Sequence, residues 1–139
     1  MRILVTVLFS TLVGTCAFAQ SALIERPLYR AMVKGNKPTV HGYALFGTLP
    51  NGQPAITKSP RGHAYFLERS LLFNADMNVL VAWGLECKTG TRYIMAMGPL
   101  ERMTAVAQEE MIDIKKSDPE NLPTLRRICD EVDLPRGKW

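Results

Sequence analysis

The chain has 139 residues, of which 47% are hydrophobic and 22% charged, and its formal net charge is +4. This length allows one small hydrophobic core and excludes two comfortable ones. Acidic and basic residues are interspersed, as in Glu109-Glu110 followed by Lys115-Lys116, whereas nucleic-acid-binding proteins concentrate basic residues on one stripe. We therefore expect no nucleic-acid partner.

The first nineteen residues have the pattern of a bacterial secretory signal peptide. Basic Arg2 precedes an apolar run over residues 3–13, and Ala17-Phe18-Ala19 forms an A-x-A cleavage site. The apolar run is shorter than the ~20 residues that span a bilayer, and no later run approaches that length. We expect a signal peptide at 1–19 and a single small α+β domain at 20–139. The predicted location is the periplasm or the outer surface of a Gram-negative bacterium, without a transmembrane helix.

Cys16 offers an alternative reading of this segment. A cysteine near the end of a signal peptide can be a lipid attachment site, and Val13-Gly14-Thr15 loosely resembles the preceding motif. Threonine fits that motif poorly, so the A-x-A site favours loss of Cys16 with the signal peptide.

Strands dominate the first half of the exported part. Short apolar or alternating runs predict a strand near Leu28–Val33, another at Thr39–Leu49 and a third at Ala64–Phe73, with a turn at 73–76. The connections are the candidate binding loops, because loops carry function more often than strands do. Their candidate residues are Pro50, Asn51, Gly52, Gln53, Lys58, Arg61 and His63.

Asn78–Met97 predicts a β-hairpin. One face of its first strand is apolar at every second residue: Val79, Val81, Trp83, Leu85 and Cys87. A three-residue loop ending at Gly90 predicts the pairs Cys87 with Thr91, Leu85 with Tyr93, Trp83 with Met95, and Val81 with Met97. In this register Glu86 meets Arg92 on the reverse face.

Two helices are predicted after the hairpin. Gly98-Pro99 opens the first, with Leu100, Met103, Ala107, Met111 and Ile114 at helical spacing. The second carries the stripe Leu122, Leu125, Ile128, Cys129 and Val132 and ends before Pro135. The expected fold class is α+β, a small mainly antiparallel sheet with a C-terminal helix packed on one face.

Cys87 and Cys129 are the two cysteines left after signal cleavage. In an exported chain an even count predicts a disulfide, and two cysteines allow one connectivity. Closing this loop contributes about 4 kcal/mol in the chain-entropy model.

Candidate chemistry is sparse. Cys87 could act as a nucleophile with His41 or His63, but the disulfide is favoured. Glu68, Glu86 and Asp113 are available for acid–base work, although their spacing brings none of them together. Met95, Met97 and Met103 with a histidine could bind Cu(I), yet core packing is the favoured role of these methionines. Without a catalytic or cofactor motif, we expect no enzyme activity, no cofactor and no metal.

The chain also resembles the surface-adhesin protein E family of small exported Gram-negative proteins. The likeness covers about Tyr65 to Cys129 and is carried by Leu85-Glu86-Cys87, Arg92-Tyr93-Ile94 and the last helix. It implies a sheet, a C-terminal helix, a disulfide and binding to host matrix or plasma proteins. Tyr65-Phe66-Leu67 stands where that family has Tyr-x-Asp, so no binding residues are carried over.

These observations predict a non-catalytic exported protein-binding module, adhesin-like in character. The alternatives are a periplasmic inhibitor or immunity protein against a secreted effector, a Cu(I) carrier, and a small periplasmic hydrolase.

Overall fold

The computed structural model describes residues 22–31, 35–71, 79–107, 111–117 and 119–139. The predicted signal peptide, Cys16 and the predicted turn at 73–76 lie outside these residues. None of the described helices is long and apolar enough to cross a membrane.

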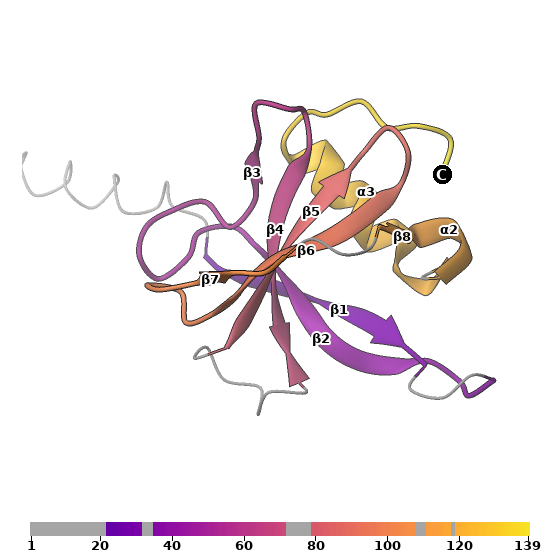
Figure 1. Cartoon of the computed structure of the whole chain (residues 1–139), viewed down its shortest axis with the longest axis horizontal. Helices are drawn as coiled ribbons and strands as arrows, with labels where there is room; N and C mark the ends of the chain where they lie inside the picture. Colours follow the sequence, from indigo (N-terminus) through magenta and orange to yellow (C-terminus); the bar gives the residue numbers. More distant parts are fainter. Residues whose placement is uncertain (1–21, 32–34, 72–78, 108–110, 118) are drawn as a thin grey trace, which may run out of the picture.

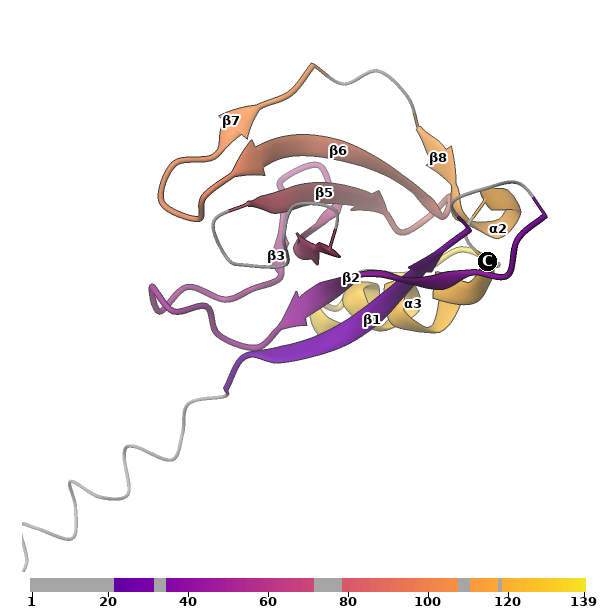
Figure 2. The ribbon, with the colours of Figure 1, turned by 90° about the horizontal axis from the view of Figure 1, so that it is seen from below.

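An antiparallel sheet dominates the fold, with the strand order β1-β2-β4-β5-β6-β7 (Figures 1 and 2). Two short strands complete it, β3 beside β4 and β8 beside β6. The strands are β1 Ile24–Arg30, β2 Thr39–Phe46, β3 Thr57–Lys58, β4 Ala64–Ser70, β5 Leu80–Glu86, β6 Thr91–Gly98, β7 Thr104–Ala105 and β8 Ile112–Asp113. The helices are α2 Ile114–Ser117, η3 Pro119–Asn121 and α3 Leu122–Glu131.

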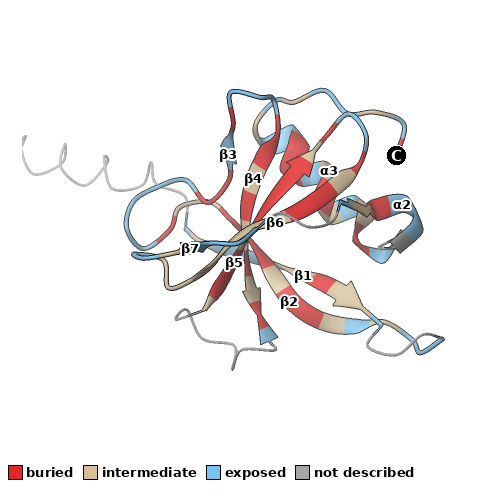
Figure 3. Ribbon diagram, in the orientation of Figure 1, coloured by how far each residue is buried: buried red, intermediate tan, exposed pale blue. Residues whose placement is uncertain are grey.

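One face of the sheet, here called the inner face, packs against α3 (Figure 3). The predicted apolar stripe of this helix is confirmed, since Leu125, Ile128 and Cys129 are fully buried. Phe66, Trp83 and Leu85 are among the strand residues that meet them. This main core forms because alternation on the strands and helical spacing on α3 present one apolar surface each. The expected mainly antiparallel sheet and C-terminal helix are thereby confirmed, with the sheet as the dominant element.

The opposite, outer face carries a smaller cluster in which no helix residue of the described chain takes part. Leu45, Leu49, Ala55 and Leu80 are buried there, and Leu67, Leu100 and Met103 pack around them half-buried. The segments before β3 and after β6 supply this cover. A sheet face covered by loops leaves more of its strand side chains accessible than one covered by a helix.

The predicted disulfide joins Cys87, directly after β5, to Cys129 in α3, with their Cα atoms 6.0 Å apart. It therefore ties the hairpin end to the helix across the inner core.

The predicted hairpin register is correct far from the turn and wrong near it. Val81 pairs with Met97 as expected, but Gly84 pairs with Tyr93. The pairs predicted for Cys87, Leu85 and Trp83 are replaced by Glu86 with Thr91, Leu85 with Arg92, and Trp83 with Ile94. The connection has four residues, Cys87–Gly90, closed by a hydrogen bond from Gly90 N to Glu86 O, and a register shift at Ala82/Trp83 restores the predicted pairing.

This shift exchanges two side chains between the faces. Arg92 lies on the inner face, with its guanidinium carbon 4.0 Å from the Trp83 ring centroid. Tyr93 lies on the outer face against Gly84. A one-residue slip reverses the direction of every side chain up to the bulge, which explains why the predicted Glu86–Arg92 neighbours are separated.

The helix predicted from Gly98-Pro99 to Ile114 is wrong for the described residues before Ile114, which begins the short helix α2. Gly98 has a left-handed φ of 133°, residues 99–102 form a turn, and β7 and β8 follow along the edge of β6. Strand pairing at that edge gains backbone hydrogen bonds for β6, so tertiary context overrides the helical spacing. Leu100 and Met103 instead pack on the outer cluster, and Ile114 is buried in the main core.

The other strand boundaries differ by a few residues. The first strand begins earlier than predicted, at Ile24, and β2 and β4 end earlier, at Phe46 and Ser70. The free edge of β1 is closed by Asn121, whose side-chain amide accepts from Tyr29 N at 2.7 Å and donates to Tyr29 O at 2.9 Å. Pro27, two residues away on that strand, has no N–H to offer, so β1 is a poor template for another strand.

Candidate binding site on the outer face

A row of residues crosses three strands of the outer face near the hairpin end. Tyr65 of β4 pairs with Gly84 of β5, which pairs with Tyr93 of β6. The Tyr93 ring lies directly on Gly84, because a Cβ built there would be 2.2 Å from Tyr93 Cζ. A glycine inside a strand marks such a close approach, and here it makes room for an aromatic ring.

His63 connects this row to a carboxylate. Its Nδ1 lies 2.6 Å from the Tyr93 hydroxyl, and its ring meets the Tyr93 ring edge-on with centroids 5.7 Å apart. Its Nε2 lies 3.8 Å from Glu86 Oε2. His63 and Tyr93 are both buried, whereas Glu86 is partly exposed. The three residues form a Glu86–His63–Tyr93 cluster, with Glu86 on its solvent side.

Burial raises the pKa of the Tyr93 hydroxyl, and Tyr65 and Glu86 add to this shift while Arg61 opposes it. A phenol with the ordinary pKa of 10.0 is already protonated at neutral pH, and the raised pKa extends that protonated range to higher pH. When the Tyr93 hydroxyl donates to Nδ1 of His63, the imidazole proton lies on Nε2. In that tautomer His63 presents an N–H to the Glu86 side of the cluster.

A cavity of about 380 Å³ adjoins this cluster. Arg61 and Lys88 supply two positive charges, Glu86 supplies one negative charge, and Leu134 and Pro135 form an apolar wall. Gly62 and His63 complete the lining. Figure 1 shows the three contributing segments, the loop after β3, the β5–β6 connection and the C-terminal segment, at one end of the molecule. Its volume is within the range of ligand sites, but most of its lining residues are polar or charged.

The C-terminal segment that forms the apolar wall is held in place by the hairpin. Gly137 N and Trp139 Nε1 both donate to Cys87 O, at 3.0 and 2.5 Å, and Leu134 N donates to Cys129 O at 3.0 Å. The Trp139 ring also packs on Gly90. Because Cys87 and Cys129 form the disulfide, the crosslink fixes the wall as well as the core.

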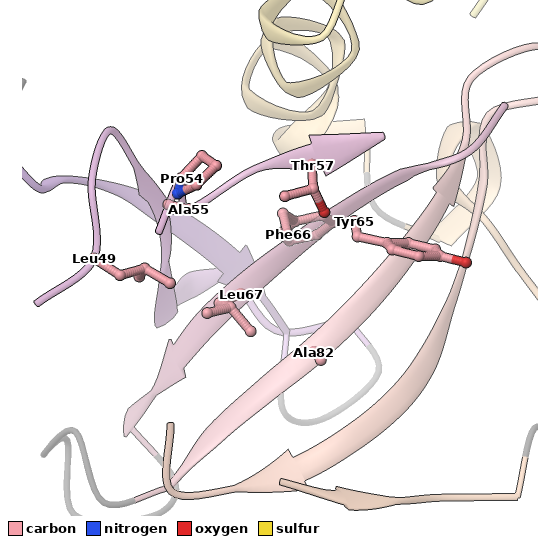
Figure 4. A pocket seen from close by; sticks show the side chains of 8 residues that line it. All are labelled: Leu49, Pro54, Ala55, Thr57, Tyr65, Phe66, Leu67 and Ala82. Carbon is pink, nitrogen blue, oxygen red and sulfur yellow. The ribbon is translucent and has the colours of Figure 1, made fainter. Parts of the chain in front are cut away.

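A shallow apolar groove of about 160 Å³ continues along the same face (Figure 4). It lies between the segment before β3 and strands β4 and β5, and Tyr65 stands at its end with the hydroxyl pointing away from Leu49 and Leu67. Tyr65 also adds to the rise in the pKa of the Tyr93 hydroxyl, as two neighbouring phenols do. The groove residues are Leu49, Pro54, Ala55, Thr57, Tyr65, Phe66, Leu67 and Ala82. Tyr65 thus links the apolar groove to the charged cavity.

The structure separates the two predicted binding loops. From the loop Lys58–His63, Arg61 and His63 line the cavity, while Lys58 is an exposed residue at the end of β3. The turn with Pro50, Asn51, Gly52 and Gln53 is exposed and lies outside the lining of both hollows, although its neighbours Leu49 and Pro54 line the groove. Sequence reasoning missed Tyr65, Tyr93, Lys88, Leu134 and Pro135. The sequence did contain one signal for this site: Gly84 interrupts an apolar strand, and a glycine there marks the close approach of another residue.

The inner face holds a second polar cluster, enclosed in the core. Trp83 Nε1 donates to Glu68 Oε1 at 2.8 Å, and His41 Nδ1 lies 3.5 Å from Glu68 Oε2. Glu68 is 3% exposed and Arg92, stacked on Trp83, is 4% exposed. Within the described chain, neither ring nitrogen of His41 has a hydrogen-bond partner.

The other sequence candidates do not converge. Cys87 is in the disulfide and is not a free thiol. The three carboxylates lie apart: Glu68 is on the inner face, Glu86 is on the outer face, and Asp113 accepts from Lys115 N. The described residues contain no group of three or more histidines, cysteines or acidic residues arranged to hold a metal ion. Met97 packs against the inner core and Met103 against the outer cluster, so these thioethers lie on opposite sides of the sheet.

Comparison with known proteins identifies no relative: no family model matches, and neither a curated protein nor a solved structure does.

Proposed function

We propose that this protein is a non-catalytic, exported protein-binding module that contacts its partner through the outer face of the sheet. The observation that carries the proposal is the continuity of the apolar groove, Tyr65 and the charged cavity on one side of the molecule. Aromatic side chains, arginine and half-buried apolar residues are the groups that protein interfaces favour.

Preorganisation supports the same proposal. The strands, the disulfide and the bonds from Gly137 and Trp139 hold the contact residues before a partner arrives. A prebuilt surface loses less conformational entropy on association than mobile loops do. At the free edge of β1, Asn121 bonds the backbone of Tyr29 and Pro27 lacks an N–H, which favours binding through side chains of the outer face over strand addition at that edge.

An exported location is part of the proposal. The disulfide is compatible with an oxidising compartment, where such bonds form and persist. The resemblance to the surface-adhesin protein E family agrees with this assignment and with an extracellular or periplasmic protein as partner.

The test is co-purification of the protein, expressed from its full-length gene, with proteins of its own cell envelope and with host matrix proteins. Arg61→Glu and Leu67→Asp place a repulsive charge in the cavity and in the groove, and we expect both to abolish capture of a stoichiometric partner. Lys116→Glu is the matched control, since this exposed lysine lies on α2. Partner capture that survives both outer-face changes would refute the proposed surface.

A further inference from the structure

The charged cavity raises the question of which chemical group it admits. Arg61 and Lys88 project positive charge into it, and His63 presents Nε2 on the side of Glu86. Three potential donors therefore line one hollow. Donors that converge on a partly enclosed site bind oxygen anions through charge-assisted hydrogen bonds.

Glu86 and the apolar wall narrow the class of anion. A free phosphate or sulfate dianion would meet the Glu86 carboxylate and be repelled by its negative charge. A single carboxylate carries less charge, and in a peptide it is flanked by backbone N–H groups that Glu86 can accept. Leu134 and Pro135 offer an apolar surface to the residue beside that carboxylate.

The groove beyond Tyr65 offers a second contact surface to a peptide whose acidic side chain enters the cavity. An extended peptide repeats on alternate residues, so one side chain can enter the cavity while another lies over the groove. Pockets for alternate side chains are the usual source of specificity in peptide recognition.

We propose that the cavity is a recognition pocket for an acidic side chain, aspartate or glutamate, next to an apolar residue in an extended segment of the partner protein. Arg61 and Lys88 bind the carboxylate, His63 donates from Nε2, and Glu86 accepts from the peptide backbone. Tyr93 is a positioning residue, because its hydroxyl sets the tautomer and orientation of His63 without touching the ligand. This inference rests on the proposed function and specifies the partner chemistry at the same site.

The experiment uses two capped peptides, acetyl-Leu-Leu-Glu-Leu-Leu-amide and acetyl-Leu-Leu-Gln-Leu-Leu-amide, with inorganic phosphate as a third probe. Each is titrated into isotope-labelled protein, and the amide signals of Gly62, Glu86 and Lys88 are followed by NMR. We expect saturable shifts with the acidic peptide and binding about tenfold weaker with the glutamine peptide, the effect of losing one charge-assisted hydrogen bond. Binding should also weaken with added salt. Equal binding of both peptides, or phosphate binding as tight as the acidic peptide, would overturn the proposal.

Three variants assign the roles. Arg61→Gln and Lys88→Gln should each weaken the acidic peptide about tenfold and leave the glutamine peptide unchanged. Tyr93→Phe should weaken the acidic peptide and shift the imidazole signals of His63, a change that loss of packing elsewhere would not produce. Unaltered peptide affinity in all three variants would contradict the assignment.

The outcomes separate this inference from the proposed function. Partner capture that depends on Leu67 but is insensitive to Arg61→Gln and Lys88→Gln would refute the carboxylate pocket and retain the binding module. Acidic-peptide binding in the cavity, with partner capture unaffected by Arg61→Glu and Leu67→Asp, would retain the pocket and refute the outer face as the partner surface.

Discussion

Two clusters on opposite faces of the sheet contain nearly the same residue types. On the inner face, Trp83 lies between Glu68 and Arg92, with His41 beside Glu68. On the outer face, Tyr93 bonds His63, which lies beside Glu86 near Arg61.

The inner cluster is enclosed by the main core, whereas the outer cluster opens on a cavity of about 380 Å³. A buried polar group stabilises the fold only through its protein partners, and its loss leaves another group unsatisfied. A polar group beside a cavity keeps some capacity for a ligand. Access to solvent, and not residue type, therefore distinguishes a structural cluster from a candidate site.

The largest expected effect concerns the disulfide, which supports both regions. Replacing Cys87 and Cys129 together by alanine should lower the free energy of unfolding by about 4 kcal/mol, because a long loop of the unfolded chain is released. Urea unfolding measures this loss. A loss of unfolding free energy below about 1 kcal/mol, no larger than that of an ordinary substitution, would show that packing alone holds the hairpin end to α3.

Trp83→Phe tests the inner cluster. It keeps an aromatic ring near Arg92 but removes the N–H that Glu68 accepts, so we expect a loss of about 3 kcal/mol in unfolding free energy and little change in the outer-face signals. Tyr93→Phe is the matched change on the outer face, and it should cost about 1 kcal/mol. Equal losses in the two variants would remove the distinction between the clusters.

Gly84→Ala tests the packing of the outer row. The added methyl group would overlap the Tyr93 ring, which should be displaced at a cost of about 2 kcal/mol. Combining it with Tyr93→Ala relieves the overlap, so the double variant should lose less stability than the two single losses together. Strictly additive losses, measured by denaturant unfolding, would argue against contact between the two residues.

Alkaline titration tests the burial of Tyr93. Its pKa is raised in the folded protein, so the native state favours the protonated phenol; this contribution to stability is complete below the unfolded value of 10.0 and is lost as pH rises through the folded pKa. Ultraviolet absorbance should show a tyrosine ionisation step above pH 10.0, and Tyr93→Phe should remove that late step. Retention of the late step in the variant would assign it to another tyrosine.

The smallest effect on stability is expected at the cavity rim. Arg61→Gln and Lys88→Gln alter exposed side chains and should change the unfolding free energy by less than about 0.5 kcal/mol. Thermal unfolding measures this change. Variants that keep their stability but lose peptide affinity would show that these side chains serve binding and not folding. A loss of stability as large as that of Trp83→Phe would show that Arg61 and Lys88 stabilise the fold.

The sequence predicted local features better than long-range ones. The apolar stripe of α3, the alternation of β5 and the Cys87–Cys129 pair are confirmed, because each is readable from spacing or from count. The helix expected after Gly98 is wrong because pairing at the edge of β6 overrides its apolar spacing. Arg61 and His63 were among the candidate loop residues, but their partner Tyr93 was assigned to the wrong face by one residue of register.

By itself the sequence determined the amphipathic patterns and the single disulfide available to Cys87 and Cys129, because these depend on residue order and count. Tertiary structure alone decided that Tyr93 meets His63, that Arg92 enters the core, and that Pro135 and Arg61 line the same cavity. The physical reason is that a four-residue turn and a bulge, each undetectable in apolar spacing, set which face every side chain of β6 occupies.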